Sequence, residues 1–110
     1  MLLVLKLGGT TVRYGQINIR EKISKLKHNN RLIIIVSALA EVTDLLLMGD
    51  IEKVRKIHHD MTSNQKTLKI IDSYLDEYIK PTNPKMTAKA LSYGEIMSMH
   101  LFSEFLGIEF

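Results

Sequence analysis

Two continuous apolar runs constrain the fold of this chain more than any other feature of its sequence. Residues 2–7 (LLVLKL) contain one lysine, and residues 32–36 (LIIIV) are β-branched at four of their five positions. Neither run alternates apolar with polar residues, which is the pattern of strands that are covered on both faces in a parallel sheet. We therefore expect an α/β protein with two buried parallel strands and helices on both faces of the sheet.

The residues between the two runs have the spacing of a helix. Ile19, Ile23 and Leu26 recur at helical intervals, and the His-Asn-Asn sequence at 28–30 ends the pattern. A strand, a helix and a second strand in this order form a βαβ unit, whose crossover is right-handed in nearly all proteins. The beginning of the chain therefore predicts one such unit.

Helical patterns also follow the second strand. Thr43 and Asp44 can cap a short helix over residues 45–48. A longer pattern over residues 51–79 weakens at Thr62-Ser63-Asn64, which predicts either two helices or one interrupted helix.

Two prolines separate this region from the end of the chain. Pro81 and Pro84 bracket a predicted loop, and the last helix is predicted from about residue 87 to residue 106. Gly107 is a typical residue to end that helix. A third strand would begin at residues 108–110.

Composition limits the class of protein. The chain has 110 residues, which we expect to form a single domain over residues 1–110. Lys and Arg are scattered among acids, the net charge is +3 and aromatic residues are few, so we expect no nucleic-acid partner. The absence of cysteine excludes disulfides and thiolate metal sites. No apolar stretch suits a signal peptide or a membrane span, so we expect a cytoplasmic protein with no membrane partner.

The first candidate site, Lys6-Leu7-Gly8-Gly9-Thr10, follows the first strand. Glycines there let backbone amides approach a phosphate, and a lysine on a rigid strand suits the charge that develops on a transferred phosphoryl group. The lysine precedes the glycines, so this is not a Walker A loop. The alternative is that Gly8-Gly9 only forms a tight turn between a strand and a helix.

The second candidate site, residues 37–44 (SALAEVTD), follows the second strand. Ligands of open α/β sheets bind at the carboxyl ends of strands, so this loop should lie beside the Gly-Gly loop. The hydroxyl groups of Ser37 and Thr43 can hydrogen-bond phosphate or carboxylate oxygens. The alternative is that Thr43 only caps the following helix.

The third candidate site, Ser92-Tyr93-Gly94-Glu95, lies inside the last predicted helix. A glycine costs a helix roughly 1 kcal/mol relative to alanine, so the close approach of a ligand or of another backbone should require Gly94. Glu95 is an anion suited to bind a ligand ammonium group. The alternative is that Gly94 allows tight helix packing and that Glu95 is solvated.

The His58-His59-Asp60 sequence is a weak candidate for a metal site. Adjacent side chains on a helix diverge by about 100° and cannot easily share one ion. We expect an exposed helix end there and no metal ligand.

Taken together, the three candidate segments resemble those of aspartate kinases. LKLGGTTV is similar to the family's KFGGTSV opening, IIIVSALAEVTDLLL to VVVSALSGVTNLLL, and ALSYGEIMSMHLFSEFLG to LSFGERLSA…L…G. The resemblance covers essentially the whole chain. It implies the N-terminal portion of the amino acid kinase fold, a three-layer α/β/α sandwich, without the family's nucleotide-binding half and regulatory domains.

The resemblance also implies a reaction and a set of site residues. The reaction is the ATP-dependent phosphorylation of the L-aspartate β-carboxylate, with Mg²⁺ bridging the phosphates, which opens the pathway to lysine, threonine and methionine. Lys6 would be the catalytic lysine, and Thr43 and Glu95 would bind aspartate, with Glu95 on its α-amino group. The residues that would contact the ATP phosphates are Lys6, Gly8, Gly9, Thr10 and Ser37.

Two acids depart from the family's pattern in the second segment. Glu41 stands where the family usually has glycine, and Asp44 stands where it usually has asparagine. Carboxylates near anionic substrates should weaken binding, unless they point away or help to hold the metal.

Two other functions stay open from the sequence. One is a module of the same fold that binds an amino acid or phosphate without catalysis, and the other is an inert fragment that is stable through self-association. Because a partial sheet exposes apolar surface, we expect a homo-oligomer or a partner that supplies the missing half.

Overall fold

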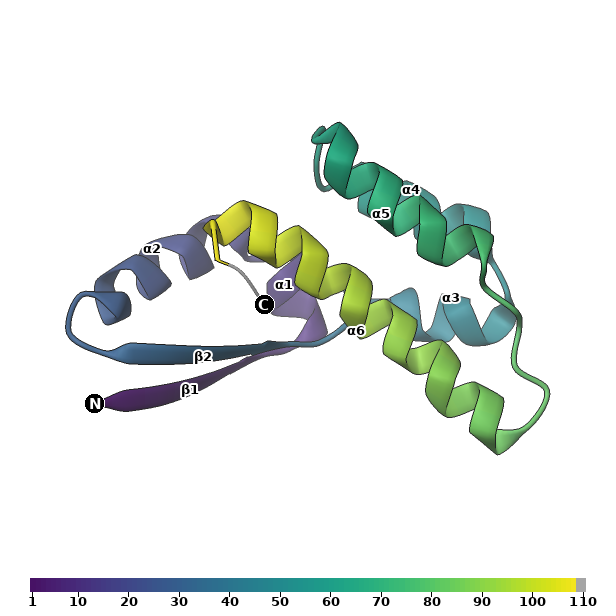
Figure 1. Ribbon diagram of the computed structural model, residues 1–110, viewed down its shortest axis with the longest axis horizontal. Coiled ribbons are helices and arrows are strands. Elements are labelled where there is room, and N and C mark those ends of the chain that lie inside the picture. Colours follow the sequence, from purple (N-terminus) through teal and green to yellow (C-terminus); the bar gives the residue numbers. More distant parts are fainter. Residues whose placement is uncertain (109–110) are drawn as a thin grey trace.

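A computed structural model describes residues 1–108 of the chain. Figure 1 shows two strands side by side, a long helix that crosses the middle of the molecule, and a helical hairpin at one end. The elements in chain order are β1 (Leu2–Leu7), α1 (Gly9–Tyr14), α2 (Gln16–Lys27), β2 (Arg31–Val36), α3 (Val42–Met48), α4 (Ile51–His59), α5 (Gln65–Asp76) and α6 (Pro84–Leu106). The third strand expected at residues 108–110 falls mainly on residues 109–110, which lie outside the described residues.

The strands β1 and β2 pair in parallel, with Leu2 opposite Arg31 and Leu7 opposite Val36. Helix α2 returns the chain from the end of β1 to the start of β2 and buries Ile19. The predicted strand–helix–strand unit is therefore confirmed. The short helix α1 was not expected, because its Gly-Thr-Thr start has no apolar periodicity.

The sheet has one covered face and one open face. On the covered face Leu5 and Ile34 pack against the core, and Figure 1 shows α2 and α6, which both contact β2, on the same side of the sheet. The mixed α/β class is confirmed, but among residues 1–108 no second layer of helices covers the other face. We call the apolar part of that face the open sheet face; its residues, which are 49–59% exposed, are Leu2, Val4, Ile33 and Ile35.

Helix α6 is the central element of the helical layer. It packs against α3 and α5, and Met97 on α6 is fully buried. The helix starts at Pro84, capped by the Asn83 side chain, which accepts from the Met86 amide at 3.0 Å. The expected start near residue 87 was therefore three residues late, because Pro84 belongs to the first turn, where its missing N–H has no cost. Its expected end at Gly107 is confirmed.

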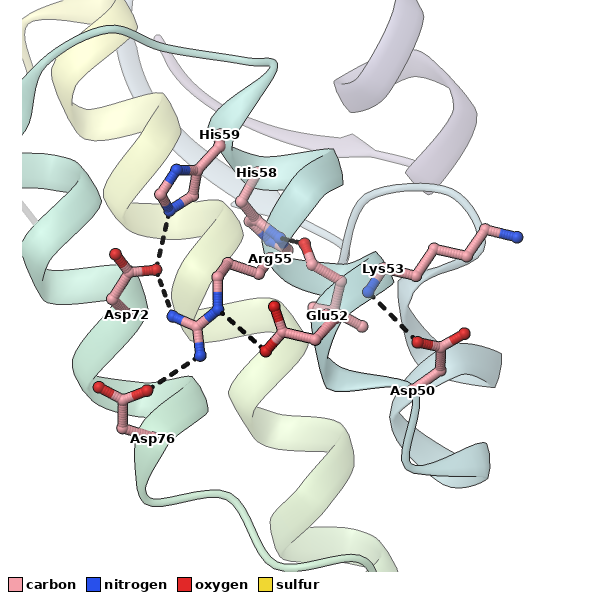
Figure 2. A network of polar contacts seen from close by, with 9 residues as sticks. Asp50, Glu52, Lys53, Arg55, His58, His59, Asp72 and Asp76 are labelled. Atoms are coloured by element: carbon pink, nitrogen blue, oxygen red, sulfur yellow. Dashed lines mark hydrogen bonds and ion pairs between the residues drawn. The ribbon is translucent and has the colours of Figure 1, made fainter.

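The long helical pattern over residues 51–79 forms two helices, α4 and α5, which is one of the two arrangements expected from the sequence. The side chain of Asn64 caps α5 by accepting from the Lys66 and Thr67 amides. Figure 2 shows how polar groups join the two helices: Arg55 on α4 donates to Asp72 at 2.7 Å and to Asp76 at 2.9 Å. These charge-assisted bonds hold α4 and α5 together as a hairpin.

Asp72 is shared by two partners in this network. His59 lies 2.8 Å from the same carboxylate oxygen that Arg55 contacts. Burial raises the pKa of Asp72, but the hydrogen bonds from His59 and Arg55 outweigh this effect and lower it below its usual range. Asp72 therefore stays charged at neutral pH.

The neighbouring residue His58 is fully buried, which corrects the expectation of an exposed helix end. Its Nδ1–H donates to the Val54 carbonyl at 2.7 Å, and its Nε2 has no hydrogen-bond partner among the described residues. Burial lowers the pKa of His58, so the ring is neutral at pH 7. The two adjacent histidines point in different directions (Figure 2), one into the core and one toward Asp72.

Two further features are absent from residues 1–108. No helix in this range is long and apolar enough to cross a membrane. No group of three or more His, Asp or Glu side chains in it is placed to hold a metal ion.

Candidate functional site

The three candidate segments meet at Ala38, which lies in the loop after β2 and is 7% exposed. A Cβ atom added to Gly9 would lie 2.8 Å from the Ala38 carbonyl oxygen, and one added to Gly94 would lie 2.9 Å from the Ala38 Cβ. The first and third segments therefore each contact the second, although the three are far apart in the sequence. This contact lies beyond the carboxyl ends of both strands, where ligands of such sheets bind.

The first segment has one crowded glycine and one open glycine. Gly9 lies against the Ala38 carbonyl, so the close packing of the first segment on the second accounts for it. Gly8, at the N-cap of α1, has φ −74° and no atom within 4 Å of an added Cβ. Its missing side chain is not explained by packing within the described chain, and it leaves room for a ligand beside the backbone.

Lys6 projects from the open face of the sheet, near the end of β1. It is exposed, lies opposite Ile35 in the strand register, and makes no ion pair within residues 1–108. Thr10 is likewise exposed at the start of α1. Both side chains are thus free to contact a ligand.

The second segment is fastened to the first by backbone hydrogen bonds. The Ser37 amide donates to the Leu7 carbonyl at 3.0 Å, and the Ala40 amide donates to the Gly9 carbonyl at 3.1 Å. The two loops are therefore held side by side, as the sequence predicted.

Thr43 lies in the first turn of α3 and is exposed. The N-cap of α3 is Glu41, and no side chain caps this helix. The capping explanation for Thr43 is therefore wrong, and its hydroxyl group stays available for a ligand.

The two additional acids behave differently from each other. The Glu41 carboxylate lies 2.7 Å from Arg13, and this hydrogen bond and charge lower the pKa of Glu41. Asp44 is exposed in the first turn of α3, where a negative charge suits the helix dipole. The Glu41 charge is thus compensated inside the chain. Sequence reasoning missed Arg13, because the partners are separated by 28 positions and no local pattern joins them.

The third segment supports the packing explanation for Gly94. Besides the contact with Ala38, a Cβ at Gly94 would lie 3.3 Å from Leu46 and 3.4 Å from Val42. The glycine lets α6 approach the second loop and α3 closely. Glu95, the next residue, is exposed. Both of the roles considered for Glu95, ligand binding and solvation, are compatible with that position.

The fold and the site define an α/β protein in which a glycine loop and a hydroxyl-bearing loop follow two adjacent parallel strands. The amino acid kinase family matches residues 1–108, and the chain belongs to this family. The comparison with curated protein sequences gave no match.

Two structures of E. coli aspartokinase III share the fold over 97% of this chain. The complex with aspartate and ADP (R-state) has a TM-score of 0.70 and 25% identity, over 29% of its own length. The complex with lysine and aspartate (T-state) has a TM-score of 0.67 and 22% identity, over 30% of its own length. The predicted resemblance and the partial amino acid kinase fold are confirmed, and the chain spans less than a third of these relatives.

Proposed function

We propose that this chain is the N-terminal part of the catalytic domain of an aspartate kinase. In the reaction, an oxygen of the aspartate β-carboxylate attacks the γ-phosphorus of ATP. The bond to the bridging oxygen breaks, and ADP leaves. The meeting of three segments at Ala38 carries this proposal, because the glycine loop after β1 and the part of α6 that contains Gly94 both pack against the hydroxyl-bearing loop after β2. The aspartate and ADP bound to the E. coli relative support it.

The roles of the residues follow from their chemistry and their positions. Lys6, on the rigid strand β1, would stabilise the negative charge on the phosphoryl group during transfer. Backbone amides at Gly8 and Gly9, with the hydroxyls of Thr10 and Ser37, would bind phosphate oxygens. Thr43 would bind a carboxylate of aspartate, and Glu95 would accept a hydrogen bond from its α-ammonium group.

We assign no metal ligand to this chain. Mg²⁺ would arrive bound to the phosphates of ATP and neutralise part of their charge. An enzyme that uses these substrates would act in the cytoplasm, in the first step of lysine, threonine and methionine synthesis.

The test is aspartyl phosphate formation by the natural protein that contains this chain, with the product trapped by hydroxylamine. We expect hydroxamate to form only when aspartate is present. The rate should fall by about 100-fold or more in Lys6→Met, because that variant removes a charge that acts on the transition state. Lys25→Met is the matched control, since Lys25 is an exposed lysine on α2. Hydroxamate formed from another amino acid and not from aspartate would contradict the proposed substrate.

Calorimetry on the 110-residue chain separates binding from catalysis. We expect heat on titration with aspartate, lost in Glu95→Gln. Aspartate binding without any hydroxamate formed by the natural protein would indicate a binding module and would contradict the kinase proposal.

A further inference from the structure

Glu41 adopts a backbone conformation that side chains rarely tolerate. Its φ is 75° and its ψ is −17°, in the left-handed region, and among residues 1–108 no other non-glycine residue has a positive φ. Such a conformation crowds Cβ against the backbone, and it persists only where the surrounding structure holds it.

Arg13 supplies contacts that hold this turn. One terminal nitrogen of its guanidinium donates to the Ala40 carbonyl at 2.9 Å and to the Glu41 carboxylate at 2.7 Å. The Arg13 side chain is 19% exposed, whereas that of Glu41 is 63% exposed. The guanidinium also lies 4.9 Å from the centre of the Tyr14 ring, within the range of a cation–π contact.

The turn is therefore tied to the first segment from two directions. The Ala40 amide donates to Gly9, and the Ala40 carbonyl accepts from Arg13. Gly9 begins α1 and Arg13 lies on the same helix, so both anchors belong to the element that follows the glycine loop. Thr43 comes two residues after Glu41, so the conformation of this turn sets the position of its hydroxyl group.

We propose that Arg13 is a positioning residue, which holds the Ala40–Glu41 turn in its left-handed conformation and thereby aims Thr43 at the substrate. This inference rests on the proposed aspartate kinase function. The glycine that the family usually has at position 41 can adopt this left-handed conformation without strain. Glu41 cannot, and in this chain the contacts of Arg13 hold it there. The proposal gives Arg13 no direct contact with the substrate.

The test compares four variants in the hydroxamate assay. In Arg13→Gln we expect KM for aspartate to rise by about tenfold, with KM for ATP within about twofold, because only the aspartate-binding hydroxyl is displaced. Arg13→Lys should stay near the wild type, since one ammonium group can donate to both oxygens. Glu41→Gly should also stay near the wild type, because glycine adopts this φ without strain. The double variant Arg13→Gln/Glu41→Gly should match Glu41→Gly.

A purely structural role for Arg13 gives a different result. Arg13→Gln would then lower the stability both of the wild type and of the Glu41→Gly variant, and it would leave the KM for aspartate unchanged. This outcome overturns the proposal. So does a double variant that is as impaired as Arg13→Gln alone.

Amide hydrogen exchange on the 110-residue chain tests the same contact without any activity. The amides of Val42 and Leu45 donate to the carbonyls of Leu39 and Glu41. Their exchange should be faster in Arg13→Gln than in the wild type. It should be no faster in the double variant than in Glu41→Gly. If the natural protein makes no aspartyl phosphate, the proposed function fails while this measurement still decides whether Arg13 holds the turn. Unchanged exchange in Arg13→Gln contradicts the inference.

Discussion

At the scale of single residues, the two adjacent glycines of the first segment serve different purposes. Gly9 has no room for a Cβ, because the Ala38 carbonyl lies 2.8 Å from where it would be, while Gly8 borders open space. Gly9→Ala should therefore destabilise the fold by about 1–3 kcal/mol through overpacking against rigid backbone. Gly8→Ala should change stability by less than about 0.5 kcal/mol, since its φ suits alanine.

The variants Gly8→Ala and Gly9→Ala together distinguish an effect on folding from an effect on ligand binding. Urea unfolding measures the stability of both variants, and calorimetry with ATP measures phosphate binding by the folded Gly8→Ala protein. We expect weaker ATP binding in Gly8→Ala despite normal stability, because the new methyl group occupies the space beside the backbone. Equal losses of stability in both variants would show that this distinction is incorrect.

Single residues also mark the limit of what the sequence could predict. Ser37 and the Gly-Gly pair were placed side by side correctly, because parallel strands direct their carboxyl ends to one edge. Glu41 was recognised only as an unusual acid. Its left-handed backbone and its bond to Arg13 depend on how α1 sits against the second loop, and no local pattern encodes that arrangement.

At the scale of elements, the hairpin of α4 and α5 contains a pH-sensitive residue. Burial lowers the pKa of His58 on α4, so the unfolded chain binds a proton at this residue more readily than the folded chain. As pH falls below the unfolded pKa of about 6.5, stability should therefore decrease, and the effect ends below the folded pKa. Protonation would place a second N–H and a charge in the core, where Nε2 has no acceptor among the described residues.

The measurement is the urea midpoint between about pH 7 and pH 5, above the range in which carboxylates titrate. We expect His58→Leu to reduce the decline and His28→Leu to leave it, since His28 is exposed at the end of α2. Burial also lowers the pKa of His100, which contributes to the decline with the same sign. A decline of the same size in both variants would assign the effect to other groups.

The elements themselves were predictable where their patterns were long. Both strands and α2 followed from apolar spacing. The break near Asn64 left either two helices or one interrupted helix open over residues 51–79, and the structure has two, α4 and α5. The start of α6 was misplaced because a proline suits both a loop and a first helical turn. The coverage of the sheet differed for another reason: an apolar strand indicates that something covers each face, but it does not indicate that the same stretch of chain supplies it.

At the scale of the whole molecule, the sheet has one open apolar face, and the structure is less compact than its length allows. The radius of gyration is 14.5 Å, against about 13 Å expected for a compact chain of this size. Sedimentation should therefore reveal concentration-dependent self-association of the 110-residue chain, driven by burial of the open sheet face.

Paired substitutions locate the surface responsible. Val4→Thr with Ile33→Thr should weaken the association. Ile17→Thr with Ile79→Thr should not, because these residues are 74% and 72% exposed but lie outside the sheet. A chain that stays monomeric at every concentration would contradict the expectation of an oligomer.

The meeting point at Ala38 also has a consequence for the order of events during protein synthesis. Gly9 leaves the ribosome early and Ala38 follows, but Gly94, which packs against Ala38 from the other side, is synthesised near the end of the described chain. Contacts between distant segments form late, because a long loop must close before they stabilise anything. A nascent chain that stops before α6 therefore carries both loops without the helix that packs against them. It should gain the ability to hold a ligand only when residue 94 has emerged.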